Sequence, residues 1–231
     1  EIEQMKKELV NIASHELKTP ITAIRGYLDM ILEGDTGPIN PDTKSLLKDV
    51  MEMSDRLARL VENLLNTSRI EQGRIEIIPQ RFNISDLIKE MITELDVKAS
   101  EKKIYLKYER PKFSPFVYAD PEKTRLVLTN LIGNGIKFTL KGGVKILLDK
   151  KDSQITVLVR DTGVGLSEEA QKNLFNKFFR VRTVQTREIP GSGLGLYIAK
   201  EILNLMNGKI WVKSKEGVGS TFSFSLPTKA P

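Results

Sequence analysis

The sequence contains a single histidine, His15, and its neighbours are suited to nucleophilic chemistry. A neutral imidazole can attack through one ring nitrogen while the other nitrogen keeps its proton. A carboxylate that accepts this proton fixes the tautomer and stabilises the positive charge of the attacking ring, and Glu16 directly follows His15. Thr19 lies four residues further on, which places it on the same face of a helix as His15. The alternative is an ordinary surface histidine beside a surface glutamate.

An acidic residue and two glycines form a second cluster at residues 161–165, DTGVG, directly after an apolar run. A strand that ends at Asp161 delivers a carboxylate that can accept a proton from an exocyclic amino group. Gly163 and Gly165 let the backbone turn and approach a ring closely. An ordinary connection between a strand and a turn is the alternative explanation.

A third cluster, GSGLGL at residues 191–196, opens an expected helix. Exposed amide groups at a helix start bind phosphate, and the cluster supplies them from Gly191, Gly193, Leu194 and Gly195. The pattern is not the dinucleotide fingerprint, because Leu196 occupies the third glycine position, and the chain lacks the G-x-x-x-x-G-K-[ST] phosphate loop. A flexible glycine hinge is the alternative.

Asn130, Asn134 and Lys137 are spaced by four and three residues, so they share one face of a helix. Two amide oxygens and a cation in a row suit a hydrated Mg²⁺ held between side chains and substrate phosphates. Gly133 and Gly135 lie in the same helix, each at a cost of about 1 kcal/mol relative to Ala. Something that approaches this helix closely would explain them, whereas a solvent-facing polar stripe is the alternative.

Residues 166–190 separate the two glycine clusters and are expected to form a lid over the site. Phe175, Phe178 and Phe179 follow the spacing i, i+3, i+4, which predicts the core face of a short helix. Arg180 follows in a stretch without apolar periodicity.

Two different structural units are needed to position these clusters. The first 72 residues predict a helical hairpin, with helix-breaking residues at positions 34–41. Apolar and small residues recur at heptad spacing in both helices. They are Val10, Ala13, Leu17, Pro20, Ile24, Tyr27 and Ile31 in the first, and Val50, Ser54, Leu57, Val61, Leu64 and Ser68 in the second. His15 falls away from the seam and is expected to be exposed, with a kink at Pro20. A single hairpin leaves apolar surface exposed to solvent, so we expect a homodimer in which two hairpins form a four-helix bundle.

After a linker at residues 73–81, residues 82–231 predict an α/β sandwich in which helices cover one face of a mixed sheet. The expected helices are residues 83–102, 121–138 and 194–206, and the expected strands are residues 104–109, 144–149, 155–160, 209–214 and 221–226.

Composition excludes several classes of protein. Forty per cent apolar and 29% charged residues suit a folded soluble chain, no apolar run is long enough to span a bilayer, and the absence of Cys excludes disulfides and thiolate sites. Residues 1–72 contain 9 basic and 13 acidic residues, whereas residues 73–231 contain 27 and 17. A basic second part suits nucleotide phosphates, nucleic acid or an anionic membrane, or is simply a lysine-rich surface. A start at Glu1 suggests a fragment of a longer protein.

Together the clusters resemble the sensor histidine kinases of two-component systems. Residues 14–20 (SHELKTP) resemble the H box in its His-Glu-x-x-Thr variant, and residues 130–139 (NLIGNGIKFT) the N box. The segments at 161–165, 175–180 and 191–196 resemble the first glycine box, the F box and the second glycine box. Five motifs in the family's order imply a dimerisation hairpin followed by a Bergerat-type ATP-binding domain. Gly135 stands where the N box often has Ala, which predicts a flexible helix without loss of binding.

The resemblance implies the following roles. ATP would bind with Asp161 on the adenine amino group and Phe138 near the base, and Thr221 would also belong to the nucleotide site. Mg²⁺ would bind Asn134 and Asn130, while Lys137 and the second glycine box would hold phosphates and Arg180 would meet the γ-phosphate. His15 would take that phosphate with the help of Glu16 and pass it to an Asp of a response-regulator receiver domain. Thr19 would position water for a phosphatase reaction on that regulator.

The resemblance also implies a cytoplasmic core, attached to the bacterial inner membrane through a segment upstream of Glu1. Three other functions are weighed against it. A degenerate kinase would be a nucleotide-gated binding module that binds ATP and signals through its conformation, without phosphorylation. The intact His15 and Glu16 argue against this function. Another Bergerat-type ATPase would lack the hairpin of residues 1–72. A nucleic-acid binder would require salt-sensitive DNA affinity, and we expect no nucleic-acid partner.

Overall fold

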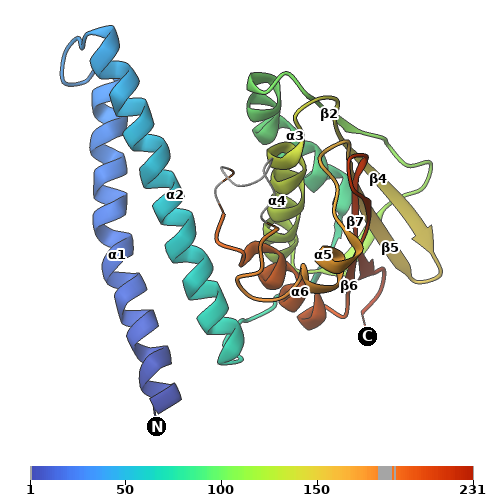
Figure 1. Cartoon of the computed structure of the whole chain (residues 1–231). Helices are drawn as coiled ribbons and strands as arrows, with labels where there is room; N and C mark the ends of the chain where they lie inside the picture. The colour runs from blue at the N-terminus through green and yellow to red at the C-terminus, as the bar shows by residue number, and fades with distance from the viewer. Residues whose placement is uncertain (1, 182–188, 190, 231) are drawn as a thin grey trace. The chain divides into compact units, whose positions relative to one another are not determined.

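The computed structural model describes residues 2–181, 189 and 191–230, with side chains from residue 16 onward. The chain divides into two compact units, Glu1–Ile75 and Glu76–Pro231 (Figure 1). The division falls inside the segment that the sequence analysis assigns to a linker. Among the described residues, no helix is both long and apolar enough to cross a membrane.

The first unit is the predicted helical hairpin, formed by α1 (Ile2–Glu33) and α2 (Pro41–Glu71). Gly34 and Gly37 adopt positive φ angles of 97° and 100° in the connection, a conformation that glycine tolerates without strain. Asn40 caps α2 by accepting a hydrogen bond from the Thr43 amide at 2.8 Å, and Pro41 occupies the first helical turn. α1 continues through Pro20 to Glu33.

The contact between α1 and α2 departs from the predicted apolar stripes. Among the described side chains of α1 the buried residues are Ile21 and Leu28, which lie outside the predicted stripe, whereas its members Leu17, Ile24 and Tyr27 are exposed. The second stripe is used in part: Ser54, Val61 and Ser68 are buried, and Val50, Leu57 and Leu64 are exposed. One helix can cover only one narrow line of its partner, so the second line of each helix remains uncovered within a single chain.

The second unit contains the predicted mixed sheet, which is confirmed. It has five strands in the order β2 (Tyr105–Tyr108), β4 (Gly143–Lys151), β5 (Gln154–Asp161), β7 (Gly219–Pro227) and β6 (Lys209–Lys215). Only β2 and β4 pair in parallel. Alternate residues of the central strands form the core, and Ile146, Val157 and Phe224 are completely buried.

Helices α3 (Ile84–Glu101), α4 (Pro121–Phe138) and α6 (Gly195–Leu205) pack against one face of this sheet (Figure 1). Asp120 caps α4 by accepting a hydrogen bond from the Lys123 amide at 3.0 Å, and its second oxygen accepts one from the Ile78 amide at 2.9 Å. Pro121 occupies the first turn, so the start of α4 is determined by local sequence.

Three elements are absent from the predicted set. Strands β1 (Gln80–Asn83) and β3 (Phe116–Ala119) pair with each other in a separate two-stranded sheet. Helix α5 (Glu168–Asn173) ends before the phenylalanines that were predicted to form a helix face. That prediction is wrong: Phe178 lies in a turn, is exposed and has a φ of 61°. Spacing alone could not distinguish a helix face from a succession of turns.

Candidate functional site

Helix α4 contains the polar row predicted from spacing. Asn130, Asn134 and Lys137 are all half-buried, and the amide nitrogen of Asn130 donates to the Leu126 carbonyl at 3.0 Å, within the helix. Lys102, which ends α3, donates from Nζ to the carbonyls of Ile136 and Lys137 at 2.8 and 2.9 Å. This ammonium group satisfies two carbonyl groups that have no partner within the helix, and so holds the last turn of α4 in place.

The second glycine cluster lies directly against this row. A β-carbon on Gly195 would lie 2.4 Å from Oδ1 of Asn130, and one on Gly191 would lie 2.9 Å from Nζ of Lys137. Gly195 begins α6, whose N-cap residue Leu194 makes no side-chain capping bond. The first amides of α6 therefore lack a side-chain cap, which is the arrangement that binds phosphate.

Asp161 ends β5 and is buried. Its Oδ1 atom accepts hydrogen bonds from the amides of Gly163 at 2.8 Å and Ser220 at 3.2 Å. Burial raises the pKa of the Asp161 carboxyl, and these two hydrogen bonds partly oppose the rise. Across the described residues no hydrogen bond reaches Oδ2, so this oxygen can accept a proton from a ligand.

The first glycine cluster packs on the end of α4. A β-carbon on Gly163 would lie 2.5 Å from the Phe138 carbonyl oxygen, which accepts a hydrogen bond from the Val164 amide at 3.3 Å. Gly165 has a φ of 69°, and a β-carbon there would lie 2.0 Å from the Lys215 carbonyl oxygen. Both glycines are therefore required by close approach of backbone to backbone.

Gly135 of α4 has a packing role that differs from the flexibility predicted for it. A β-carbon on Gly135 would lie 3.0 Å from the Val144 side chain and 3.8 Å from the β-carbon of Asp161. The missing side chain lets α4 approach the sheet near the carboxylate. Gly133 has no such neighbour, since a β-carbon there would meet nothing within 4 Å.

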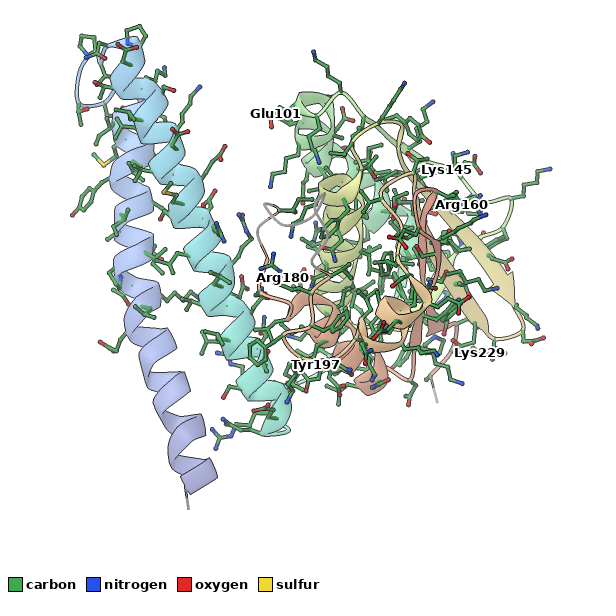
Figure 2. The ribbon with its side chains drawn as sticks, in the orientation of Figure 1. Glu101, Lys145, Arg160, Arg180, Tyr197 and Lys229 are labelled. Atoms are coloured by element: carbon green, nitrogen blue, oxygen red, sulfur yellow. The ribbon has the colours of Figure 1, made fainter. Side chains whose placement is uncertain are left out.

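The described part of the predicted lid contacts α6 and the second glycine cluster. A β-carbon on Gly193 would lie 2.7 Å from the backbone of Phe178, and Nζ of Lys177 lies 4.9 Å from the centre of the Tyr197 ring. Arg180 donates to the Ile189 carbonyl at 2.8 Å, within its own segment (Figure 2 labels Arg180 and Tyr197). Residues 182–188 and 190 of the predicted lid lie outside the described residues.

The geometry favours Ser220 over Thr221 as the residue of β7 that belongs to this site. Thr221 pairs with Arg160, which precedes Asp161, so Thr221 lies on the sheet face opposite the Asp161 side chain. Ser220 alternates with it and bonds Asp161 through its amide. Ser220 lies two residues before Phe222 and four before Phe224, both of which are buried. Strand alternation therefore predicts from the sequence that Ser220 is on the inner face of the sheet.

His15 lies in the helical backbone of α1, and its side chain is outside the described part of the chain. Glu16 and Thr19 of the same motif are exposed.

A divalent metal at α4 would depend on amide and phosphate oxygens. The described residues contain no group of three His, Cys, Asp or Glu side chains that could hold an ion. Mg²⁺ commonly retains several waters and binds few protein ligands beside substrate phosphates. Asn130, which lies against the uncapped start of α6, and Asn134, one turn further along α4, fit such a site.

Comparisons with known proteins agree with this arrangement of motifs. Residues 5–73 match the family model of the His Kinase A (phospho-acceptor) domain. Residues 119–230 match that of the histidine kinase-, DNA gyrase B-, and HSP90-like ATPase. The Sensor protein SrrB of Staphylococcus aureus is 34% identical over 228 residues, which are 98% of this chain and 39% of that protein.

Solved structures are similar to the whole chain or to its second part. Full-length ShkA in complex with AMPPNP has a TM-score of 0.77 at 27% identity, covering 97% of this chain and 47% of ShkA. The catalytic domain of the histidine kinase ThkA has a TM-score of 0.57 at 29% identity, covering 67% of this chain and 97% of that domain. The Acinetobacter baumannii histidine kinase AdeS, at 24% identity and a TM-score of 0.66, shares the fold over 94% of this chain and 98% of its own.

These matches define the class: a phospho-acceptor domain followed by an ATPase domain, as in the core of a protein-histidine kinase. The chain belongs to the sensor histidine kinases, and it spans 39% of the length of the SrrB relatives that it matches.

Proposed function

We propose that this chain transfers the γ-phosphate of ATP to His15 and then to an aspartate of a response regulator. The convergence of both glycine clusters on α4 carries the proposal: Gly195 lies against Asn130, and Gly163 lies against the Phe138 carbonyl. Two segments that bind opposite ends of a nucleotide are thereby held on one helix. The AMPPNP complex of ShkA, a structural neighbour, supports ATP as the ligand.

Adenine is recognised at the Asp161 end of the site. Oδ1 of Asp161 is held by the amides of Gly163 and Ser220, which leaves Oδ2 to accept a proton from the exocyclic amino group. The Phe138 carbonyl lies against Gly163, next to this carboxylate, and the Phe138 ring is the aromatic group proposed to lie near the base. The phosphates extend toward Lys137 and the amides at the start of α6.

Phosphoryl transfer then requires mainly position and charge neutralisation. One imidazole nitrogen of His15 attacks the γ-phosphorus, a nitrogen–phosphorus bond forms, and the bond to the bridging oxygen of ADP breaks. Glu16 accepts the proton of the other ring nitrogen, which would otherwise leave the phosphorylated ring positively charged. Lys137 neutralises phosphate charge, and Arg180 is a further candidate once it leaves the Ile189 carbonyl.

Asn134 and Asn130 would hold Mg²⁺ by their amide oxygens. Such an ion would supply positive charge to neutralise the phosphates during transfer. Asn130 is oriented for this role because its amide nitrogen is bonded to the Leu126 carbonyl, which turns Oδ1 toward Gly195.

The helical hairpin would serve as the dimer interface and as the docking surface for the regulator. The exposed line of Leu17, Ile24, Val50 and Leu57 supports a homodimer, because a second hairpin would cover it. Attachment of the full-length protein to a membrane, through a segment outside this chain, is part of the same proposal and is drawn from the sensor relatives.

Thr19 is proposed to position water for dephosphorylation of the regulator. It is exposed on the same turn as Glu16, where a bound receiver domain could reach it. We expect Thr19→Ala to slow dephosphorylation of a phosphorylated receiver domain and to leave autophosphorylation close to wild type. Equal dephosphorylation rates in the two proteins would contradict the assignment.

The test of the kinase proposal is autophosphorylation with γ-labelled ATP and Mg²⁺. Wild type is expected to acquire a label that survives base and is lost in acid, as a phosphoramidate does, and His15→Gln is expected to acquire none. His15→Gln should still bind ATP, because its substitution lies in the other unit. Label on the His15→Gln protein would refute the acceptor, and ATP binding without label in wild type would favour a nucleotide-gated binding module.

A further inference from the structure

The side-chain amide of Gln171 in α5 closes the open edge of the main sheet at Ser214. β6 is the edge strand, so the outward N–H and C=O of Ser214 have no neighbouring strand. Nε2 of Gln171 donates to the Ser214 carbonyl at 3.1 Å, and the Ser214 amide donates to Oε1 of Gln171 at 3.1 Å. The amide thus makes the pair of hydrogen bonds that another strand would make.

Gln171 also holds the loop that follows Asp161. Its Nε2 donates to the Leu166 carbonyl at 3.2 Å, with a longer contact to the Ser167 carbonyl at 3.4 Å. The Leu166 amide in turn donates to Oγ of Ser214 at 2.8 Å. Gln171 and Ser214 therefore clamp the end of the loop whose other end supplies the Gly163 amide to Asp161.

A second path leads from Ser214 to the same carboxylate. Oγ of Ser214 donates its one proton to the Gly219 carbonyl at 2.9 Å. In its 2.9 Å contact with Oγ of Ser220 it must therefore be the acceptor, so Ser220 donates. The Ser220 amide then donates to Oδ1 of Asp161 at 3.2 Å. Both amides that orient Asp161 belong to segments anchored on Ser214.

We infer that Gln171 is a positioning residue for adenine recognition, acting on Asp161 through Ser214 and Ser220. The inference rests on the proposed role of Asp161 as the adenine acceptor. Gln171 lies in α5, six residues before Lys177, which contacts Tyr197, and seven before Phe178, which contacts Gly193. The same residue therefore ties the beginning of the segment above the phosphates to the carboxylate that selects the base.

The expected consequence is a loss of base selectivity. Gln171→Leu approximately keeps the size of the side chain but removes its hydrogen bonds. Asp161 then loses its fixed orientation, and we expect ADP to bind about 5- to 20-fold more weakly. GDP, which has a carbonyl where adenine has its amino group, gains nothing from Asp161, so its affinity should change less than about twofold. A purely structural effect would weaken both nucleotides alike.

The experiment measures dissociation constants for ADP and GDP with the whole chain. Gln80→Leu is the matched control, because Gln80 is exposed in β1 of the same unit and the same substitution there should change neither affinity. Ser214→Ala should lower the preference for ADP as Gln171→Leu does. In the double variant the loss of preference for ADP, expressed as a free energy, should be smaller than the sum of the two single losses. The reason is that both substitutions act on Asp161 through the same hydrogen bonds. Should Gln171→Leu fail to fold by circular dichroism, Gln171→Glu replaces it, because a carboxylate cannot donate to the Ser214 and Leu166 carbonyls.

The outcomes separate the inference from the function on which it rests. Equal weakening of ADP and GDP by Gln171→Leu, or an unchanged preference, overturns the role of Gln171. A wild-type protein without preference for ADP, or an Asp161→Asn variant that keeps the preference, overturns the proposed adenine site itself. Full additivity of Gln171→Leu and Ser214→Ala refutes the shared path.

Discussion

Gly195 and Asn130 approach so closely that a β-carbon on the glycine would lie 2.4 Å from Oδ1 of the asparagine. These residues are 65 positions apart in the sequence, and they bring the start of α6 onto the polar face of α4. The contact joins the amides proposed to bind phosphate to the side chain proposed to bind the metal. Only glycine permits this distance, because real β-carbons do not approach an oxygen so closely.

Gly195→Ala is expected to impair nucleotide binding without unfolding the domain. The new methyl group must displace Asn130 or shift the start of α6, and we expect ATP to bind at least about tenfold more weakly, since about 1.4 kcal/mol is lost with one good charged hydrogen bond. Titration calorimetry with ATP and Mg²⁺ would measure the effect. Gly133→Ala, on the same helix as Asn130 but with open space around the new methyl, is the control and should bind normally.

The two glycines within α4 are expected to differ in stability effect. Gly133→Ala should raise the free energy of unfolding by about 0.5–1 kcal/mol, because alanine favours the helix and meets nothing. In a unit of this size that corresponds to a rise in Tm of about 2–4 °C per kcal/mol. Gly135→Ala should show no gain or a loss, since its methyl would press on the fully buried Val144. Calorimetric unfolding of both variants compares them, and an equal rise in Tm would refute close packing at Gly135.

Asp161→Asn is expected to weaken ADP binding and to stabilise the nucleotide-free protein. The variant retains an oxygen for the Gly163 and Ser220 amides but presents an NH₂ group to the adenine amino group, so two donors face each other. The loss of a charged hydrogen bond predicts about 10- to 100-fold weaker ADP binding. Burial of the charge is unfavourable, as the raised pKa of Asp161 indicates, so the nucleotide-free variant should unfold at a higher temperature than wild type near neutral pH. Unchanged ADP affinity would remove Asp161 from the site.

The same raised pKa predicts opposite effects of pH on stability and on binding. The folded state holds the Asp161 proton more tightly than the unfolded chain, so the group contributes stability below its ordinary pKa of 3.8 and loses it as pH rises through the folded pKa. Adenine needs the ionised acceptor, so ADP affinity should fall as pH falls through that raised pKa. Titrations of wild type and Asp161→Asn between about pH 4 and 8 separate this effect from phosphate protonation, which affects both proteins. If ADP affinity changed with pH in the same way in both proteins, ionisation of Asp161 would not be the cause.

Local sequence determined most of the elements that support the site. Asp120 and Pro121 define the start of α4, and the spacing of Asn130, Asn134 and Lys137 places them on one face of it, because capping and helical period depend only on nearby residues. The resemblance of the five motifs to those of sensor histidine kinases likewise predicted a hairpin with a phosphoacceptor histidine and a nucleotide-binding sheet domain. The family comparisons confirm this class of protein.

Tertiary structure decided which residues meet. The Ser220 amide bonds Asp161 because the register of β5 and β7, in which Thr221 pairs with Arg160, brings the next residue, Ser220, beside Asp161. Phe178 lies exposed in a turn, with Gly193 packed on its backbone, although its spacing with Phe175 and Phe179 suits a helix equally well. Such contacts between remote segments depend on sheet register and helix packing, which periodicity within one segment does not specify. The class of protein and most local elements therefore followed from the sequence alone, whereas the hydrogen bonds of Gln171 to Ser214 appear only once the chain is folded.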